Sequence, residues 1–239
     1  MTKIAILGAR GRMGQAIARL APDHGAEVVL AIDKGEGELG SLKKSGASVL
    51  IDFSTPDVVV GAARACADSG VALVSGTTGL DDGHRDSLSD AAKRVAVLWE
   101  PNMSVGVLVL SKLLRSAIAM LGDGFDVEIV ETHHRLKVDA PSGTAKRLAE
   151  IAHEARKGPS VTGREGKPGK RTNDEVGVLA VRGGDVIGDH VVHLLGQGER
   201  LELVHRATSR DVFAHGALRA STWIAGKPAG RYALADILE

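Results

Sequence analysis

The sequence predicts an α/β protein in which a doubly wound parallel sheet is joined to a smaller α+β lobe with a mixed sheet. Short apolar runs alternate with helical patterns through residues 3–104, as in parallel strands connected by helical crossovers. Three strand-like runs then lie close together in residues 176–207 without a helix between them, which indicates antiparallel or mixed pairing. The 239 residues suffice for two such lobes, named here the first and the second lobe.

The strands of the first lobe are predicted from continuous apolar runs, because a parallel strand covered on both faces has no polar side. These runs cover residues 3–9, 27–33, 48–54, 71–77 and 95–100. A helix between the first two runs is indicated by Met13, Ile17 and Leu20, whose spacing places them on one helical face. Pro56 favours the first turn of a second helix, and a third helix is expected over residues 82–93.

The second lobe begins with a long helix that is apolar on most sides, so we expect it to be buried between layers. Helices are predicted over residues 105–121 and 144–156, and strands over residues 125–134, 176–182, 186–196 and 200–207. Residues 157–175 are rich in glycine, proline and charge, which is typical of a long exposed loop. A last helix over residues 211–226 and the tail after it are expected to return to the first lobe. The lobes therefore divide as residues 1–104 with 211–239, and residues 105–210.

Charge balance and cysteine content disfavour several classes of protein. Thirty Lys and Arg residues offset thirty Asp and Glu residues, which argues against nucleic acid as a partner because phosphate binding needs a basic surplus. Cys66 is the only cysteine, so no disulfide can form within the chain. The sequence enters a strand directly after Met1, and we expect no apolar run to approach the ~18 residues that a membrane span needs. These features predict a cytoplasmic protein without a membrane partner.

A glycine-rich turn follows the first strand and opens the first helix. Gly8, Gly11 and Gly14 form a variant of the dinucleotide-binding fingerprint of Rossmann-like folds. The first glycine permits a tight turn, the second lets backbone N–H groups approach a pyrophosphate, and the third allows close packing of helix on strand. The helix N-terminus favours the anion, and Arg10 and Arg12 are placed to contact phosphates. A purely structural turn is the alternative, but the flanking elements favour a nicotinamide dinucleotide.

Two polar residues at the end of the second strand bear on the choice of cofactor. Asp33 can accept a hydrogen bond from a ribose 2′-hydroxyl, which favours NADH, whereas Lys34 can meet a 2′-phosphate, which permits NADPH. Dual use of NADH and NADPH is therefore expected. Residues 52–56 and 76–79 end later strands and are expected to border the same crevice, although the alternative for each is an ordinary turn.

The most informative stretch of the second lobe is the basic box, residues 131–145 (ETHHRLKVDAPSGTA). Its basic residues are His133, His134, Arg135 and Lys137, and the helix start after them carries Ser142, Gly143 and Thr144. Ser142 is expected to cap this helix, so that the next two N–H groups form an anion nest. Cations beside a helix N-terminus suit a small dicarboxylate, and a histidine can move a proton near neutral pH.

A metal site and a solvated charged loop are the alternatives for the basic box. Adjacent histidines at the end of a strand point to opposite faces, and no further ligand stands at a suitable spacing, so no metal is expected. Other basic residues of this lobe are expected to lie on a surface or to satisfy hydrogen bonds in the core. These are Arg182, His190, His193, His205 and Arg210.

Over nearly its whole length the chain resembles the 4-hydroxy-tetrahydrodipicolinate reductase (dihydrodipicolinate reductase) family of bacterial lysine and diaminopimelate synthesis. The motifs that carry the resemblance, in the family's order, are GARGRMG, DFSTP, GTTG, PNMSVGV, ETHHRLKVDAPSGTA, VRGGDVIGDH and SRDVFAHGAL. The resemblance implies a Rossmann-like lobe and a mixed-sheet lobe that builds a homotetramer. It also implies reduction of a cyclic imine dicarboxylate by NADH or NADPH, with loss of water, to give tetrahydrodipicolinate.

The resemblance further implies roles for individual residues. His133 matches the proton donor and acceptor, and Lys137 matches the second proton donor. The residues expected to contact substrate are His134, Ser142, Gly143 and Thr144. The residues expected to contact cofactor are Gly8, Ala9, Arg10, Gly11, Arg12, Met13, Asp33, Lys34, Gly76, Thr77, Thr78, Glu100, Pro101, Asn102 and Met103. The first lobe is then the dinucleotide-binding domain, and the second is the substrate-binding and tetramerisation domain.

Two departures from the family pattern bear on the cofactor. Glu100 stands where the family usually has alanine, and the segment between Asp33 and Asp52 is shorter than in many relatives. The resemblance therefore does not carry over a preference between NADH and NADPH. Two other functions stay open: another amino-acid-pathway dehydrogenase with the same plan, which would lack the basic box, and a non-catalytic NAD(P)H sensor, which would have no use for Lys137.

Overall fold

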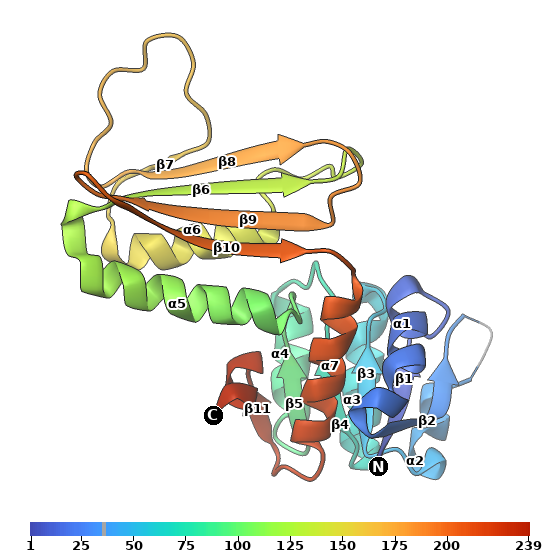
Figure 1. Ribbon diagram of the computed structural model, residues 1–239. Helices are drawn as coiled ribbons and strands as arrows, with labels where there is room; N and C mark the ends of the chain where they lie inside the picture. Colours follow the sequence, from blue (N-terminus) through green and yellow to red (C-terminus); the bar gives the residue numbers. More distant parts are fainter. Residues whose placement is uncertain (35–36) are drawn as a thin grey trace. The chain divides into compact units, whose positions relative to one another are not determined.

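The computed structural model describes residues 1–34 and 37–239, so residues 35–36 of the short segment after Asp33 lie outside the described residues. The chain forms two compact units (Figure 1). Unit 1 comprises residues 1–105 and 210–239, and unit 2 comprises residues 106–209. A parallel sheet in unit 1 and a separate mixed sheet in unit 2 confirm the predicted fold class.

The six strands of unit 1 are parallel and lie in the order β11-β5-β4-β3-β1-β2. They are β1 (Thr2–Leu7), β2 (Ala26–Ile32), β3 (Val49–Asp52), β4 (Ala72–Ser75), β5 (Ala96–Trp99) and β11 (Gly230–Tyr232). All four residues of β3 and of β4 are buried, as the continuous apolar runs predict. The strand order reverses direction at β1, and in such sheets the crevice at the carboxyl ends beside the reversal is where ligands bind.

Helices cover both faces of this sheet. α7 (Asp211–Ile224) packs on α1 (Arg12–Leu20) and crosses the central strands, whereas α3 (Pro56–Ser69) packs on α4 (Asp82–Ala91). The core beside α3 and α4 takes alternate residues of the strands, among them Leu50, Leu73 and Val97. The alternation of strand side chains leaves the intervening residues to face α1 and α7.

Several short elements of the described chain have no counterpart in the sequence prediction, because they are too short to show a periodic pattern. They are α2 (Leu42–Ser45) and the 3-10 turns Pro22–His24, Leu39–Ser41, Gly122–Gly124 and Leu234–Leu238. The region after residue 226 was expected to be a plain tail, but β11 pairs with β5 as a sixth parallel strand. The strand has only three residues and includes Gly230, which has a low β propensity, so the sequence pattern does not predict it.

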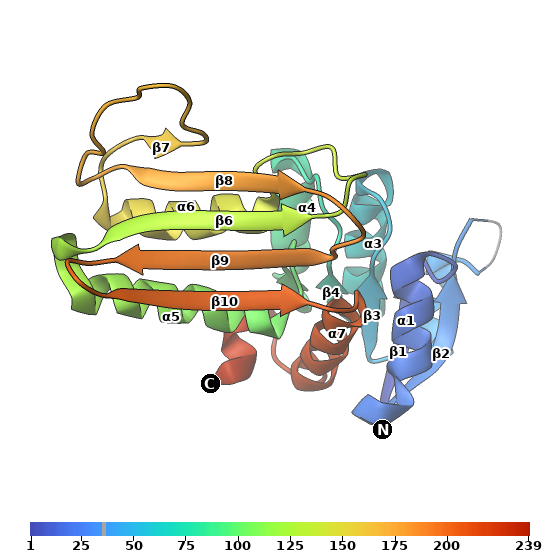
Figure 2. The same cartoon turned by 45° about the horizontal axis from the view of Figure 1, so that its top comes forward.

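The mixed sheet of unit 2 has the order β10-β9-β6-β8-β7. The strands are β6 (Asp126–His133), β7 (Ser160–Val161), β8 (Val176–Arg182), β9 (Gly188–Leu195) and β10 (Arg200–Ala207). β9 pairs antiparallel with both β6 and β10, while β8 pairs parallel with β6 and β7, as the closely spaced runs predict. α5 (Val105–Leu121) and α6 (Gly143–Ala155) pack on one face of this sheet (Figure 2).

The expectation that no apolar stretch approaches the length of a membrane span was wrong. Val105–Gly124 is a helical stretch of 20 residues with a mean hydropathy of 1.7, long and apolar enough to span a membrane by length and composition. Leu110, Leu114 and Ile118 on one side of this helix pack in the core of unit 2. Val109, Leu113 and Met120 are exposed, so the expectation that the helix is buried between layers was also wrong. Core helices of soluble proteins pass the same test, so the finding indicates a span only weakly.

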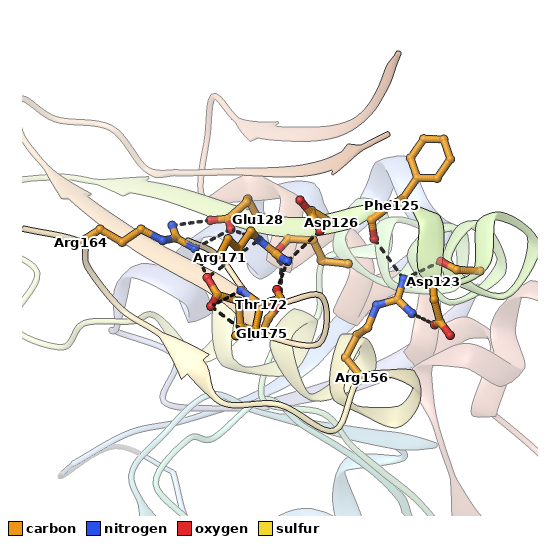
Figure 3. A network of polar contacts seen from close by, with 11 residues as sticks. Asp123, Phe125, Asp126, Glu128, Arg156, Arg164, Arg171, Thr172 and Glu175 are labelled. Atoms are coloured by element: carbon orange, nitrogen blue, oxygen red, sulfur yellow. Dashed lines mark hydrogen bonds and ion pairs between the residues drawn. The ribbon is translucent and has the colours of Figure 1, made fainter. Parts of the chain in front are cut away.

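The segment over residues 157–175 is irregular apart from β7, and an arginine–carboxylate cluster attaches it to β6 (Figure 3). Arg164 donates to both oxygens of Glu128 at 3.0 and 2.7 Å and to Glu175 at 2.7 Å. Arg171 donates to Asp126 at 2.8 Å and to Glu128 at 3.1 Å. Asp126 and Glu128 lie on the opposite face of β6 from Val127 and Ile129, so this cluster leaves the core-facing side of the strand free for other groups.

Candidate active site

The backbone of the glycine turn in unit 1 leaves no room for side chains at Gly8 and Gly14. Gly8 adopts a positive φ of 82°, and a Cβ there would lie 2.7 Å from the Phe53 carbonyl oxygen. A Cβ at Gly14 would lie 2.3 Å from the Gly8 carbonyl oxygen. Gly11 is the N-cap of α1 and has no side chain to cover the first N–H groups of the helix. The start of α1 therefore has no side-chain cap from Gly11, an arrangement that suits an anionic group at a helix N-terminus.

Asp33 is tied directly to this turn. Its carboxylate accepts the Arg10 N–H and the Lys34 N–H, each at 2.7 Å. The hydrogen bond from Arg10, together with that from Lys34, holds the pKa of Asp33 below its ordinary value. The carboxylate expected to meet the ribose is therefore ionised and held in place by the loop that is expected to meet the pyrophosphate.

A buried aspartate at the start of the DFSTP motif, to which the sequence analysis gave no role of its own, supports the loop after β4. Asp52 accepts hydrogen bonds from the hydroxyls of Ser75 at 2.8 Å and Thr77 at 2.9 Å. The Trp99 indole N–H donates to the Thr77 carbonyl at 2.8 Å, and the Phe53 ring lies against Gly76, where a Cβ would come within 2.4 Å of it. Gly76 and Thr77 are thereby fixed, whereas Thr78 is exposed.

The segment after β5, residues 100–104, is fixed by hydrogen bonds and by packing against α7. The Glu100 N–H donates to the Ser75 carbonyl at 3.1 Å, and the Asn102 side chain accepts the Ser104 N–H at 2.9 Å. Met103 is buried, and a Cβ at Gly216 of α7 would lie 1.7 Å from the Met103 carbonyl oxygen. The lack of a side chain at Gly216 therefore allows α7 to lie directly on this segment.

The structure brings all of the predicted cofactor residues to one edge of the parallel sheet. They follow the carboxyl ends of four strands: Gly8 to Met13 after β1, Asp33 and Lys34 after β2, Gly76 to Thr78 after β4, and Glu100 to Met103 after β5. In a doubly wound sheet this edge is the ligand-binding edge.

In unit 2, the basic box joins the end of β6 to the start of α6. Ser142 is the N-cap of α6 and accepts the Ala145 N–H at 3.2 Å, as predicted. Gly143 and Thr144 follow in the first turn, and a Cβ at Gly143 would meet open space. The Ser142 hydroxyl also lies 3.2 Å from Nε2 of His190 on β9, so the helix start is tied to the sheet.

A buried carboxylate, Glu131, connects the histidine of the basic box with this helix start. It lies two residues before His133 on the same face of β6, and its Oε2 is 2.6 Å from His133 Nδ1. Its Oε1 accepts the Ser142 N–H at 3.0 Å. Arg182 of β8 donates to both oxygens, each at 2.8 Å. Burial alone would raise the pKa of Glu131, but the hydrogen bonds from Arg182, His133 and Ser142 outweigh it and hold this pKa below its ordinary value.

His133 and His190 form a pair of buried rings. Their centroids are 5.3 Å apart and the rings meet edge to face. Burial lowers the pKa of His133, although the Glu131 carboxylate opposes this. Burial also lowers the pKa of His190 to about 4, and the charge of His133 adds to the effect. A Cβ at Gly188 would lie 2.9 Å from His133 Nε2, so the glycine makes room for that atom.

Lys137 and His134 lie in the loop after β6. The Lys137 ammonium is 2.8 Å from an Asp139 carboxylate oxygen and its side chain is 21% exposed. The backbone N–H of Lys137 donates to the His134 carbonyl at 3.1 Å, and the backbone N–H of His134 donates to the Val186 carbonyl at 2.7 Å. The hydrogen bond from Lys137 lowers the pKa of Asp139. Lys137 is thus partly exposed and anchored close to the buried His133.

Within the described chain, no three His, Cys, Asp or Glu side chains are grouped so as to hold a metal ion. The basic residues Arg182 and His190 satisfy hydrogen bonds in the core of unit 2, one of the two roles expected for them. Glu131, Asp52 and Gly216 lie within the motifs, but the sequence analysis gave none of them a role of its own. A polar residue inside or at the end of a buried apolar strand is the one sequence signal that marks Glu131 and Asp52.

We expect the free energy of unfolding to fall as the pH decreases from about 6.5 to about 4, in part through His190. Its folded-state pKa of about 4 lies below the ordinary 6.5, so in this window only the unfolded chain binds a proton there. One such proton changes the free energy by about 1.4 kcal/mol per pH unit. The measurement is the free energy of unfolding, obtained from urea unfolding at several pH values between 7 and 4 for the wild type and for His190→Asn. The plot of this free energy against pH should be shallower for the variant than for the wild type, by the equivalent of about one proton. An unchanged slope would contradict this role of His190.

Comparisons with known proteins identify the family of the chain. A family model described as "Dihydrodipicolinate reductase, N-terminus" matches residues 2–103, and one described as "Dihydrodipicolinate reductase, C-terminus" matches residues 106–238. A 4-hydroxy-tetrahydrodipicolinate reductase from Anaeromyxobacter dehalogenans is 45% identical over 264 aligned positions, covering 100% of this chain and 98% of the relative. One from Thiobacillus denitrificans is 42% identical and covers 99% of this chain and 98% of the relative.

A solved structure shares the fold across both units. Dipicolinate-bound dihydrodipicolinate reductase from Paenisporosarcina sp. TG-14 matches with a TM-score of 0.80 and 25% identity, covering 98% of this chain and 97% of that one. Family model, full-length relatives and fold agree, and the chain belongs to the dihydrodipicolinate reductase family.

Proposed function

We propose that this chain reduces 4-hydroxy-tetrahydrodipicolinate to tetrahydrodipicolinate, with loss of water, using a nicotinamide dinucleotide. The observation that carries the proposal is the basic box, where a buried histidine and the N-terminus of α6 are joined through one carboxylate. A histidine next to an anion-binding helix start suits reduction of an anionic ring. Relatives that align over the whole chain are named for this reaction.

The substrate contacts are assigned to the start of α6 and to His134. The N–H groups of Gly143 and Thr144 follow the Ser142 cap and offer donors to a carboxylate, aided by the helix dipole. The solved relative from Paenisporosarcina binds dipicolinate, a flat dicarboxylate. A small dicarboxylate is therefore the class of ligand that we assign to unit 2.

The cofactor contacts are assigned to the strand ends of unit 1. The open N-terminus of α1 would hold the pyrophosphate, and Asp33 and Lys34 would face the ribose of the adenosine. When bound, the reduced nicotinamide supplies the hydride. We propose that both NADH and NADPH serve, because Asp33 offers an acceptor to a 2′-hydroxyl while Lys34 offers a cation to a 2′-phosphate.

The protons are assigned to His133 and Lys137. Reduction leaves negative charge on the substrate ring, which a nearby protonated group must neutralise. His133 is the proposed proton donor and acceptor, since Glu131 holds its Nδ1 and leaves Nε2 to exchange a proton. Lys137 is the proposed second proton donor, positioned by Asp139.

The proposal includes a homotetramer in the cytoplasm. Val181 and Val204 are 47% and 44% exposed on the face of the unit 2 sheet that α5 and α6 leave uncovered. Exposed apolar side chains on a sheet face favour association with other copies of the chain. Cys66 is a buried free thiol, which suits a reducing compartment.

The test is an assay of the purified chain with freshly prepared substrate and either NADH or NADPH. Substrate-dependent oxidation of both cofactors is expected, and the ratio of the two kcat/KM values measures the preference. Pyridine-2,6-dicarboxylate should raise the Tm, and raise it more when cofactor is present. If neither NADH nor NADPH supports turnover, the proposed reaction is contradicted. Cofactor binding without turnover indicates a sensor instead.

A further inference from the structure

Glu131 is a fully buried carboxylate whose hydrogen-bonding capacity is completely used. Oε2 accepts from His133 at 2.6 Å and from Arg182 at 2.8 Å, and Oε1 accepts from Arg182 at 2.8 Å and from the Ser142 N–H at 3.0 Å. Two carboxylate oxygens offer about four acceptor positions, so these contacts fill all of them. No position is left for substrate, and any effect of Glu131 on the reaction must pass through the groups that it holds.

The first such group is the His133 ring. Because Arg182 binds Glu131 through both oxygens, the carboxylate stays ionised and can only accept hydrogen bonds. The neutral His133 ring must then carry its hydrogen on Nδ1, which leaves Nε2 as the atom that takes up or releases a proton. Partners of this kind fix the tautomer and the orientation of an imidazole.

The second group is the start of α6. The Ser142 N–H is fixed by Glu131, while the Ser142 hydroxyl caps Ala145 and lies beside His190. The same carboxylate therefore sets both the atom that exchanges a proton and the place where the anion-binding N–H groups begin.

Glu131 also opposes the groups that disfavour a charged His133. The charged groups that act on this ring are Glu131 on β6, Lys137 in the basic box and Arg182 on β8, and the His190 ring of β9 packs against it. Asp139 pairs with Lys137, and His205 on β10 acts on His190. Burial outweighs the carboxylate, so the pKa of His133 lies below its ordinary value, and the cations Lys137 and Arg182 contribute. Loss of the Glu131 charge would lower this pKa further.

We infer that Glu131 is a positioning residue that fixes His133 as the Nδ1–H tautomer and aligns the start of α6 for the substrate carboxylate. This inference rests on the proposed function, because it assigns Glu131 a part in that reaction. The carboxylate acts through its hydrogen bonds to His133 and Ser142, and Arg182 keeps it ionised. It touches neither substrate nor cofactor.

The test is the Glu131→Gln variant, in which the side-chain amide can donate to His133 Nδ1 and so favour the Nε2–H tautomer. We expect kcat to fall by about a hundredfold or more, as for loss of a correctly oriented acid–base group. KM for the substrate should rise as well, and the limb of the pH–rate profile that belongs to His133 should move to lower pH. In ¹⁵N NMR of histidine-labelled protein, with His133 assigned from His133→Asn, the ring should be protonated at Nδ1 in the wild type and at Nε2 in the variant.

The matched control is Glu128→Gln, which makes the same change on the other face of β6, in the cluster with Arg164 and Arg171. It should keep the wild-type pH profile. A Glu131→Gln variant with wild-type kcat and pH profile, or a wild-type His133 protonated at Nε2, overturns the inference. The wild-type NMR measurement decides the matter even where the variant fails to fold. An inactive wild type refutes the proposed function instead, and leaves the tautomer of His133 to be measured separately.

Discussion

Lys137→Ala is expected to lower kcat by about a hundredfold or more, the usual scale for loss of a general acid. Lys137 is held by Asp139 at 2.8 Å and is partly exposed, so its ammonium is oriented and still reachable by a ligand of unit 2. Because Lys137 belongs to unit 2, NADH and NADPH should bind the variant as they bind the wild type. The measurements are steady-state kinetics and titration of each cofactor by quenching of Trp99 and Trp223 fluorescence.

The control for this variant is Lys146→Ala, which removes an exposed lysine from α6 of the same unit. It should leave kcat close to the wild-type value. If Lys137→Ala keeps wild-type kcat, Lys137 has no part in proton transfer, and the assignment based on the basic box fails at this residue.

Gly14→Ala is expected to weaken the binding of NADH and NADPH by about a hundredfold or more, since phosphate recognition depends on this turn. The new methyl group would lie 2.3 Å from the Gly8 carbonyl oxygen and 2.6 Å from the Ala9 Cα, so the turn must move away from α1. Overpacking of this kind also costs about 1–3 kcal/mol of stability. Titration calorimetry gives the two Kd values, and urea unfolding gives the change in stability.

Gly40→Ala is the matched control, because a Cβ at Gly40 meets no atom within 4 Å and its φ is not positive. It should change neither Kd nor stability appreciably. A Gly14→Ala variant that binds both cofactors like the wild type would show that the turn has another purpose.

Local chemistry explains what could be predicted. Gly8 and Gly14 follow a strand and enter a helix, so the need for a tight turn and close packing is visible in the sequence. Ser142 precedes a helical pattern and caps it, as expected. The roles of His133 and Lys137 in proton transfer came from the resemblance to the family, because a basic loop alone fits several functions.

Contacts between distant segments explain what could not be predicted. Arg182 meets Glu131 only because β8 pairs with β6 in parallel, a choice of neighbour that strand patterns do not reveal. Gly216 matters because α7 lies on the Met103 backbone, and helical spacing within α7 gives no sign of it. The membrane-length expectation failed because Lys112 and Arg115 break the apolar run of α5 but do not much lower its mean hydropathy.

The strand β11 has a consequence for how the protein is made. Unit 1 takes its last helix and its outermost strand from residues after 209, whereas unit 2 is one continuous stretch, residues 106–209. Ribosomes add roughly 5–20 residues per second, so synthesis of unit 2 delays completion of the parallel sheet by about 5–20 s. During that interval β5 is the outermost strand on one side of the sheet, because β11 has not yet been made. Its unpaired backbone groups are a site where nascent chains can aggregate or recruit a chaperone.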